Sequence, residues 1–570
     1  MAILKAGESS AAKSSTGDTM EQTISSRPLA NFSPSVWGCR FASLSSSPTE
    51  MEFYRRQVEQ AKAKVEKMLA ASAADGPFRN VELINLLERL GVSYHFQTQI
   101  EDQLRLIFQQ SLSDITERRN DLYSVSLVFR VLRQHGYRVP CDVFDEFKDV
   151  KTGEFKECVR GDVRGILSLY EASHLRLHGE PILEEALAFS RQQLEEYSSS
   201  SSSTKPHLAA HIENALICPF HKSARRIDSW RFISFYADEE ESRDETLLRF
   251  AKLDFNFVQL MHQNELAFVS RWWRDTGLQE KLLYARDRIV ELYFWATGSH
   301  YEPHKVVARI AATKFAKMVS LVDDTYDAYG TPEELQLFTT AFERCDDESA
   351  VEQLPDDMQF LFRAFLRLCD EMEQDMEKEG RCYSAHHAKD AFKELARAYD
   401  TEAKWLANRY TPTVKEFMAN GIPSSSYGVI SAAYFIGMGE AMGTEEYEWL
   451  KTNPTIDTAT KLLGRLLNDI MSHEDEQKRG HCPSAVECYK KENGASDEEA
   501  VEAIKKMCDD AWKDLNEECM RPTPVEMPVI QHFLDLVRII TFIYIRNDSY
   551  THSGSLKDHI TSILLDSIPI

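Results

Sequence analysis

Apolar residues recur at helical spacing along almost the whole chain, and few folds are compatible with that pattern. The alternating three-and-four spacing of an amphipathic helix returns in segments 52–71, 81–90, 104–117, 122–134 and 183–196. Gly91 follows the second of these segments and is a suitable C-terminal cap. Alternating strand patterns bounded by hairpin turns are nearly absent. The sequence therefore predicts an all-α protein.

The chain is long enough to form more than one helical domain. Its 570 residues, of which 43% are hydrophobic, can bury substantial cores. We expect residues 1–26, which are rich in Ser and Ala, to form a disordered leader. Pro28 and Pro34 favour an extended strap directly after it. Aromatic residues become frequent beyond about residue 248, so we expect an N-terminal helical domain at 27–250 and a second domain at 251–570.

The net charge and the cysteines exclude several classes of function. A formal net charge of −25 argues against a broad surface for nucleic acid or an anionic membrane, since both need clustered Lys and Arg. The eleven cysteines form neither a CxxC pair nor a zinc-type spacing, which indicates a reducing compartment. No apolar run reaches the roughly 18 residues of a membrane span. The leader is poor in basic residues and contains acidic ones, unlike a transit peptide, so we expect a cytoplasmic protein.

Two aspartates in an apolar segment are the first candidate metal ligands. Asp323 and Asp327 lie within the run 315–329, and in a helix they would be about 40° apart on one face. Closely spaced carboxylate oxygens repel each other unless a hard cation such as Mg²⁺ lies between them. A solvated acidic face is the competing interpretation, because 91 of the 570 residues are acidic. The apolar neighbours favour carboxylates that face inward.

A second oxygen-rich cluster and several arginines extend this candidate site. Asn468, Ser472 and Glu476 are spaced by four and again by four, so their side chains would descend one face of a helix. Amide, hydroxyl and carboxylate oxygens all suit Mg²⁺, although such residues are also common on solvated helices. Guanidinium groups match phosphate oxygens, and a diphosphate bound together with the metal would explain the nearby arginines Arg286, Arg288 and Arg465. The alternative is that Arg286 and Arg288 pair with Asp287 or other surface acids.

The joint arrangement resembles the plant terpene synthases, in particular the class I sesquiterpene cyclases. The resemblance covers residues 27–570. It rests on ordered motifs, which read RPLANFSPSVWG (27–38), AKLDFNFVQLMHQNEL (251–266), RWW (271–273), ARDRIVELYFW (285–295), DDTYD (323–327), LLNDIMSHEDEQKRGH (466–481), YTH (550–552) and LLDSIPI (564–570).

The resemblance implies two helical domains with different roles. The N-terminal domain would be an α-barrel without a catalytic motif, in agreement with the absence of a DxDD sequence, and the C-terminal domain a class I helical bundle. Three Mg²⁺ ions would be the cofactors, and Mn²⁺ could replace them. Asp323 and Asp327 would bind two ions, with Asp324 of the same motif one layer behind them. Asn468, Ser472 and Glu476 would bind the third ion, and the diphosphate would lie against Arg286, Arg288 and Arg465.

The resemblance also identifies candidate pocket and lid residues. Trp295, Tyr427 and Tyr544 match aromatic residues that line the family's pocket. A mobile lid is expected near 548–554, where Asp548 and Tyr550 would act in proton transfer. This chain is one residue shorter than the family pattern between Tyr544 and the YTH motif, which leaves the match of Asp548 open.

The sequence favours farnesyl diphosphate as the substrate. Monoterpene enzymes of the family carry an Arg-Arg pair where this chain has Arg27-Pro28, and they follow a long basic transit peptide. We therefore expect a monomeric, Mg²⁺-dependent sesquiterpene synthase that ionises a prenyl diphosphate, releases diphosphate and cyclises the cation. The alternatives are a monoterpene synthase acting on geranyl diphosphate and, from another class, a non-catalytic helical scaffold. The sequence does not identify the product.

Overall fold

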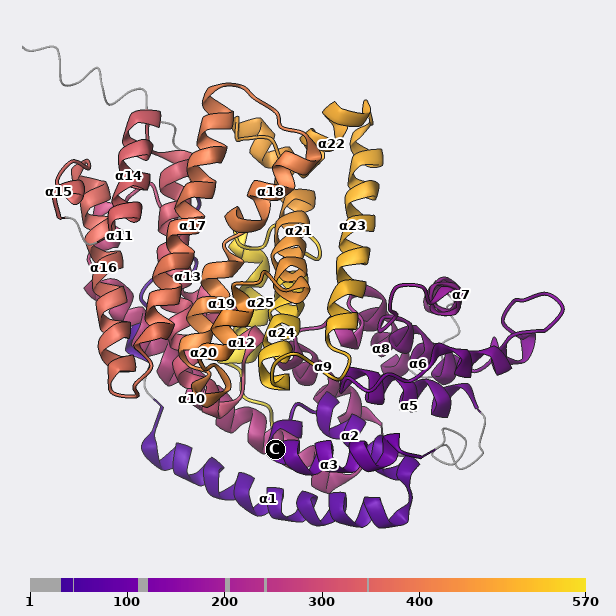
Figure 1. Cartoon of the computed structure of the whole chain (residues 1–570). Coiled ribbons are helices and arrows are strands. Elements are labelled where there is room, and N and C mark those ends of the chain that lie inside the picture. The colour runs from indigo at the N-terminus through magenta and orange to yellow at the C-terminus, as the bar shows by residue number, and fades with distance from the viewer. Residues whose placement is uncertain (1–31, 45, 111–120, 200–205, 240–242, 346–347) are drawn as a thin grey trace, which may run out of the picture.

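The prediction of an all-α protein is confirmed. The computed structural model describes residues 32–44, 46–110, 121–199, 206–239, 243–345 and 348–570. In these ranges the chain forms helices joined by loops (Figure 1), and the sole β pairing is an isolated antiparallel bridge between Lys148 and Phe155. The expected leader, 1–26, lies outside the described residues.

The described α-helices are α1 (Pro48–Asp75), α2 (Pro77–Arg89), α3 (Gln97–Phe108), α5 (Leu122–Gln134), α6 (Val163–Ser173), α7 (Pro181–Ser199), α8 (Pro206–Ile217), α9 (Arg225–Asp238), α10 (Glu245–Asp275), α11 (Leu278–Lys281), α12 (Ile289–Ser299), α13 (Val306–Ala328), α14 (Pro332–Arg344), α15 (Glu348–Val351), α16 (Asp356–Glu377), α17 (Cys382–Ala407), α18 (Val414–Ser424), α19 (Tyr427–Ile436), α20 (Thr444–Leu450), α21 (Thr455–Arg479), α22 (Ala485–Asn493), α23 (Asp497–Glu518), α24 (Met527–Ile543) and α25 (Lys557–Leu564). Short 3₁₀ helices join several of them, namely η2 (Phe41–Ser43), η3 (Ser93–Phe96), η4 (Cys141–Phe147), η5 (Glu157–Val159), η6 (Phe220–Lys222), η7 (Pro303–Lys305), η8 (Gly439–Ala441) and η9 (Ser553–Leu556).

The helices form two groups. In Figure 1 the indigo and purple helices α1 to α8 occupy the lower and right part of the molecule, and the long magenta-to-yellow helices α13, α16, α17, α21 and α23 stand as a bundle above them. The helix α10 contacts both groups, because α1 packs along it on one side and α12 and α13 on the other.

The C-terminal tail is fastened to α10 by side-chain amides. Asn256 donates to the carbonyl oxygen of Ile568 at 2.9 Å and accepts from its N–H at 2.8 Å. Gln259 and Gln263 donate to carbonyl oxygens near the end of α25. The motifs 251–266 and 564–570, which lie about 300 residues apart in the sequence, therefore contact each other.

The boundary predicted at residue 250 falls inside a helix of the structure. The helix α10 begins at Glu245, where the Asp244 side chain accepts hydrogen bonds from the N–H groups of Thr246 and Leu247 at 2.7 and 3.1 Å. It then runs without interruption through residue 250. A boundary at 250 would cut a helix, so we place the proposed boundary in the segment 239–244 between α9 and α10.

The described part of the N-terminal strap lies against the second group of helices. Trp37 and Phe41 are buried in the main core, and η2 packs on α10. The Ser46 hydroxyl donates to the carbonyl oxygen of Leu260 at 3.1 Å and to the side-chain oxygen of Asn264 at 2.7 Å. These contacts hold residues 32–44, which we call the strap, over α10 and direct its first residues toward the site described next.

Candidate active site

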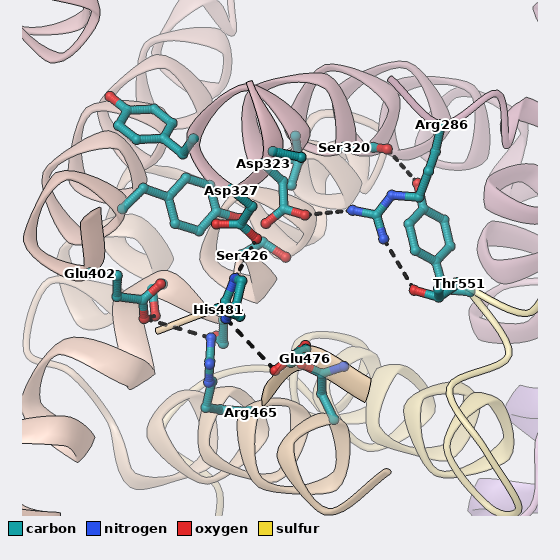
Figure 2. Close-up of a pocket in the computed structure, with 18 of the residues that line it drawn as sticks. Arg286, Ser320, Asp323, Asp327, Glu402, Ser426, Arg465, Glu476, His481 and Thr551 are labelled. Atoms are coloured by element: carbon teal, nitrogen blue, oxygen red, sulfur yellow. Dashed lines mark hydrogen bonds and ion pairs between the residues drawn. The ribbon is translucent and has the colours of Figure 1, made fainter. Parts of the chain in front are cut away.

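A cavity of about 780 Å³ opens at one end of the helical bundle. Figure 2 shows the polar side of this cavity, where α13 carries Asp323 and Asp327 and α21 faces them with Arg465 and Glu476. The structure also brings most of the other predicted residues to this cavity, namely Arg286, Trp295, Tyr427, Asn468, Tyr544, Asp548 and Tyr550. Asp324, Arg288 and Ser472 do not line it.

The aspartates of α13 point in two directions. Asp323 and Asp327 face the cavity, whereas Asp324 is fully buried behind them. The Asp324 carboxylate accepts a hydrogen bond from the N–H of Arg286 at 2.7 Å and forms an ion pair with its guanidinium at 2.7 Å. Asp324 therefore contacts Arg286 from behind the cavity wall.

The two cavity aspartates have different electrostatic surroundings. Burial, followed by the charge of Asp327, raises the pKa of Asp323 above its ordinary value, although Arg286 lies 2.6 Å away. Burial also acts to raise the pKa of Asp327, but the ion pair with His481 at 2.9 Å outweighs it and lowers that pKa. The two neighbouring carboxylates each pair with a cation, Asp323 with Arg286 and Asp327 with His481, so the site favours binding of further positive charge such as a metal ion.

The second motif presents its oxygens from α21. Asn468 and Glu476 line the cavity, and Oε2 of Glu476 is a buried atom without a hydrogen-bond partner. Ser472 lies between them on the same helix, but its hydroxyl donates to the carbonyl oxygen of Asn468 at 3.0 Å. That hydroxyl would have to turn before it could bind a metal.

Arg465 is held in the cavity by two acids that the sequence analysis did not identify. Its Nε lies 3.0 Å from Asp469, and its Nη1 lies 3.6 Å from Glu402 of α17. Burial raises the pKa of Asp469 to about 7 and also raises the pKa of Glu402. The Ser424 hydroxyl donates to Glu402 at 2.6 Å. The guanidinium is therefore fixed before any anion binds.

The two arginines near α12 point in different directions, and the structure does not bring the predicted diphosphate ligand Arg288 to the cavity. Arg286 lines the cavity and points to Asp323 (Figure 2). Arg288 is fully buried, and its guanidinium donates to carbonyl oxygens of Ser33 in the strap and Tyr550 in the loop after α24, at 2.9 and 3.3 Å. Because its guanidinium donates to backbone carbonyls, Arg288 ties two chain segments together and does not line the cavity.

His481 is a functional candidate that the sequence analysis missed. Its ring lies between the two metal-binding motifs, with Nε2 2.9 Å from Asp327 and Nδ1 3.8 Å from Glu476 (Figure 2). The neighbouring Cys482 thiol and Asp327 raise its pKa well above the ordinary value, although burial opposes this shift. The residue ends the motif LLNDIMSHEDEQKRGH, but spacing alone gives no reason to place it opposite Asp327.

Aromatic rings form one wall of the cavity. The Trp295 ring centroid lies 6.1, 6.4 and 6.1 Å from those of Tyr427, Tyr544 and Tyr550. Gly464 on α21 makes room for Tyr427, because a Cβ at this position would fall 1.9 Å from its ring. Much of the remaining lining is aliphatic and includes Leu292, Ala296, Ala312, Val319 and Ile430. The wall is apolar and rich in π faces, as a site for a cationic hydrocarbon requires.

The loop after α24 closes one side of the cavity. The Asp548 carboxylate accepts hydrogen bonds from the N–H groups of Tyr550 and Thr551 at 3.0 and 3.1 Å, which shapes the turn. The Tyr550 hydroxyl donates to Ser320 of α13 at 2.5 Å. From the strap, the Phe32 ring lies 4.6 Å from the Arg286 guanidinium. Asp548 is thus engaged in loop structure, and a role in proton transfer remains a hypothesis.

The donor set fits Mg²⁺. Among the described residues, no three His, Cys, Asp or Glu side chains form a ready-made metal centre. The carboxylates of α13 and the Asn and Glu of α21 instead face each other across the cavity, so each helix supplies part of a coordination shell. This arrangement suits Mg²⁺, which is commonly held by one or two carboxylates together with the phosphates of a substrate. Oε2 of Glu476 has no hydrogen-bond partner and lies 3.8 Å from Nδ1 of His481, so its lone pairs are available for such a contact.

Two family models match the chain. Residues 36–216 match the terpene synthase N-terminal domain, and residues 274–514 match the metal binding domain of the terpene synthase family. A protein of Ricinus communis described as probable terpene synthase 6 is 50% identical over 95% of this chain and 99% of its own length. The (−)-germacrene D synthase of Vitis vinifera is 45% identical over 95% of this chain and 96% of its own length.

A solved structure has the same fold. Isoprene synthase from grey poplar leaves (Populus x canescens), in complex with three Mg²⁺ ions and dimethylallyl-S-thiolodiphosphate, has a TM-score of 0.84. It is 32% identical and covers 91% of this chain and 99% of its own. In the part of the chain that the structure describes, no helix is long and apolar enough to span a membrane. The chain therefore belongs to the terpene synthase family and is a plant-type class I terpene synthase, a lyase that acts on prenyl diphosphates.

Proposed function

We propose that this enzyme is a sesquiterpene synthase that ionises farnesyl diphosphate, releases diphosphate and cyclises the farnesyl cation. The observation that carries the proposal is a single cavity in which a cluster of carboxylates and arginines meets an aromatic wall. One end suits an anion bound with metal, and the other suits a hydrocarbon cation. A non-catalytic scaffold, the alternative from another class, is wrong because the chain belongs to a family of enzymes.

The polar end supports departure of the diphosphate. Arg286 and Arg465 are preorganised cations on opposite sides of the cavity, each already held by acids. Bound by Asp323, Asp327, Asn468, Ser472 and Glu476, Mg²⁺ would neutralise the negative charge that develops on the leaving group. We propose three such ions, and the three Mg²⁺ of the isoprene synthase complex support this number.

The apolar end supports control of the cation. Trp295 and the tyrosines around it present π faces that stabilise positive charge without attacking it. The aliphatic lining keeps water away from a cation that water would quench. Phe32 of the strap and Tyr550 of the loop lie at the border between the two ends, on either side of Arg286. They are placed to exclude solvent after the diphosphate has left.

The choice of farnesyl over geranyl diphosphate rests on the sequence and on relatives. This chain has Arg27-Pro28 where monoterpene enzymes carry an Arg-Arg pair, and a (−)-germacrene D synthase is among the proteins most similar to it. The fold does not set the chain length, because isoprene synthase uses the same fold with a dimethylallyl group. The cavity of about 780 Å³ is within the usual range for ligand sites and has room for the longer chain. Geranyl diphosphate remains the alternative substrate.

Product analysis tests this proposal directly. The purified enzyme is incubated with farnesyl, geranyl or geranylgeranyl diphosphate and Mg²⁺, and the volatile products are identified by mass spectrometry. We expect cyclic C15 products from farnesyl diphosphate and the highest kcat/KM with this substrate. Preferred turnover of geranyl diphosphate would establish the alternative, and no turnover of any of the three would contradict the proposal.

Asp323→Asn tests the metal assignment within this function. Loss of one carboxylate ligand should weaken Mg²⁺ binding and so leave the negative charge on the leaving group less well neutralised, which should lower kcat by at least about 100-fold. Asp510→Asn makes the same chemical change on the exposed face of α23, where the carboxylate lies 3.5 Å from Lys513, and should leave the rate unchanged. Wild-type rates for Asp323→Asn would remove this residue from the metal site.

A cytoplasmic location and a monomeric state stay predictions from the sequence.

A further inference from the structure

A fully buried lysine lies on the same helix as the metal-binding aspartates, and the function described above gives it no role. Lys317 of α13 has no exposed surface. Its ammonium donates to the carbonyl oxygen of Arg286 at 2.5 Å and lies 4.3 Å from the centroid of the Trp273 ring. Burial of a charged amine costs free energy unless specific partners compensate for it. The hydrogen bond to the Arg286 carbonyl oxygen is one of the contacts that compensate for this cost.

Lys317 and Asp324 hold the two sides of the Arg286 backbone. They are seven positions apart, which places them two turns apart on one face of α13. Asp324 accepts from the Arg286 N–H at 2.7 Å, and Lys317 donates to the Arg286 carbonyl oxygen. Both peptide groups that flank the Arg286 side chain are thus fixed by the helix that also carries Asp323.

The loop around Arg286 depends on this attachment. Residues 282–288 connect α11 to α12 without forming a helix of their own. Asp287 accepts a hydrogen bond from Nε1 of Trp273 at 2.9 Å, and this is the same indole over which the Lys317 ammonium lies. Within this loop Arg286 faces the cavity, whereas Arg288, two residues later, is turned away from it. Small changes in the backbone would therefore move a cation toward or away from the diphosphate.

We propose that Lys317 is a positioning residue for Arg286, which it holds where its guanidinium meets the diphosphate of the substrate. This inference rests on the proposed function, because it assigns the ligand of Arg286. Lys317 does not line the cavity, so it acts only through the loop. The chemistry it serves is recognition of a diphosphate bound with Mg²⁺.

A second buried lysine provides a matched control. Lys314 lies one turn earlier on α13 and is likewise buried. Its ammonium pairs with Glu371 at 2.6 Å and lies 5.3 and 5.2 Å from the rings of Phe268 and Trp272. Each lysine therefore donates to an oxygen and lies over an aromatic ring. The oxygen belongs to Glu371 for Lys314 and to Arg286 for Lys317. Replacement by Met removes the charge and keeps the length of the side chain in both cases.

The experiment measures binding of inorganic pyrophosphate in the presence of Mg²⁺ by calorimetry, together with kcat and KM for farnesyl diphosphate. We expect Lys317→Met to weaken pyrophosphate binding and to lower kcat, each by about 10-fold, because a misplaced guanidinium loses its contact. Lys314→Met should lose comparable thermal stability but bind pyrophosphate within about 2-fold of the wild type. Lys317→Arg, which retains a donor, should recover most of the affinity and provides a second variant if the Met variant does not fold.

Combination with Arg286→Met identifies the route of the effect. If Lys317 acts through Arg286, adding Lys317→Met to Arg286→Met should weaken pyrophosphate binding no further. Independent, multiplying effects would overturn the inference, as would equal pyrophosphate affinity of the two lysine variants. If the wild-type enzyme binds no pyrophosphate, the proposed function fails and the inference fails with it. Binding by the wild type with unchanged binding by Lys317→Met overturns the inference alone.

Discussion

At the scale of single residues, His481 links the two motifs that we propose bind metal. Its ring contacts Asp327 of α13 and Glu476 of α21, which are the oxygens that a metal would need. We predict that His481→Asn tightens metal binding in the absence of substrate by about 3- to 10-fold, because removal of a competing cation frees both carboxylates. Titration with Mn²⁺, followed by electron paramagnetic resonance, measures this affinity directly.

His473 gives the control for this prediction. It lies on α21, whose C-terminal end His481 follows, and it pairs with Glu487 at 3.3 Å without lining the cavity. His473→Asn should leave Mn²⁺ affinity unchanged. Weaker binding in His481→Asn than in the wild type would show that the histidine helps the metal instead of competing with it.

The candidate site was predictable where side-chain spacing alone determines direction. Asp323 and Asp327 share a helix face, as do Asn468 and Glu476, and all four line the cavity. Arg288 is different, because its direction depends on a loop whose path is fixed by the strap and by the segment after α24. Lys317 and Glu402 likewise acquire their roles from partners far along the chain. Local periodicity contains no information on such contacts.

At the scale of elements, the apolar pattern located several helices well. The predicted segment 122–134 is α5 itself, and 52–71, 81–90 and 183–196 lie almost wholly within α1, α2 and α7. Gly91 follows α2 with φ +74°, as a terminating glycine should. The predicted segment 104–117 differs from the structure, because α3 ends at Phe108 and residues 111–120 lie outside the described part. Apolar spacing reports a buried face and does not report where the helix stops.

The strap and the loop after α24 form a second element-scale unit, which is joined by Arg288. We predict that Arg288→Met releases both segments, since its guanidinium donates to Ser33 and Tyr550 together. Water should then reach the cation, so the fraction of alcohol products should rise and kcat should fall by about 10-fold. Gas chromatography of the products and limited proteolysis of the strap measure the two effects.

Arg271 provides a matched control for the strap. Its guanidinium donates to the carbonyl oxygen of Ala42 at 3.2 Å, at the other end of the strap and on the surface. Arg271→Met should increase proteolysis slightly and leave the product profile as in the wild type. An unchanged profile in Arg288→Met as well would contradict a sealing role for these segments.

At the scale of the whole molecule, the N-terminal helices support the catalytic bundle through buried polar contacts. Tyr94 and His95 lie 2.7 and 2.8 Å from Asp254 of α10. The Tyr301 hydroxyl donates to the carbonyl oxygen of Gly91 at 3.0 Å. The backbone N–H of Arg521 donates to the carbonyl oxygen of Gly136 at 2.8 Å. These hydrogen bonds fix the described N-terminal helices against α10 and against segments of the C-terminal bundle.

Stability of the whole molecule should depend on buried histidines. Burial lowers the pKa of His211 to about 4. It also lowers the pKa well below the ordinary value for His174, His221, His262, His300 and His532. These side chains are neutral in the folded protein, whereas the unfolded chain takes up their protons below a pH of about 6.5. Each histidine thus lowers the free energy of unfolding as the pH falls, by about 1.4 kcal/mol between pH 7.5 and 5.5.

Buried carboxyl groups act in the opposite direction. Burial raises the pKa of Asp469 to about 7 and that of Asp228 to about 6. The folded protein therefore keeps protons that the unfolded chain has already released, and this contribution to stability grows as the pH falls toward 4. The unfolding free energy of the wild type therefore depends on pH through opposing contributions from buried histidines and buried carboxyl groups. The contribution of a single histidine is obtained by comparison with a variant that lacks it.

His532→Gln isolates one histidine. His532 pairs with Nε2 of His300 at 3.0 Å, and a glutamine amide can replace that hydrogen bond without taking up a proton. Between pH 7.5 and 5.5 the wild type should lose about 1.4 kcal/mol more unfolding free energy than this variant, as measured by urea denaturation at both pH values. The exposed His386 gives the control, since His386→Gln should follow the wild type. Equal losses in His532→Gln and the wild type would mean that His532 takes up its proton over the same pH range in the folded and the unfolded protein.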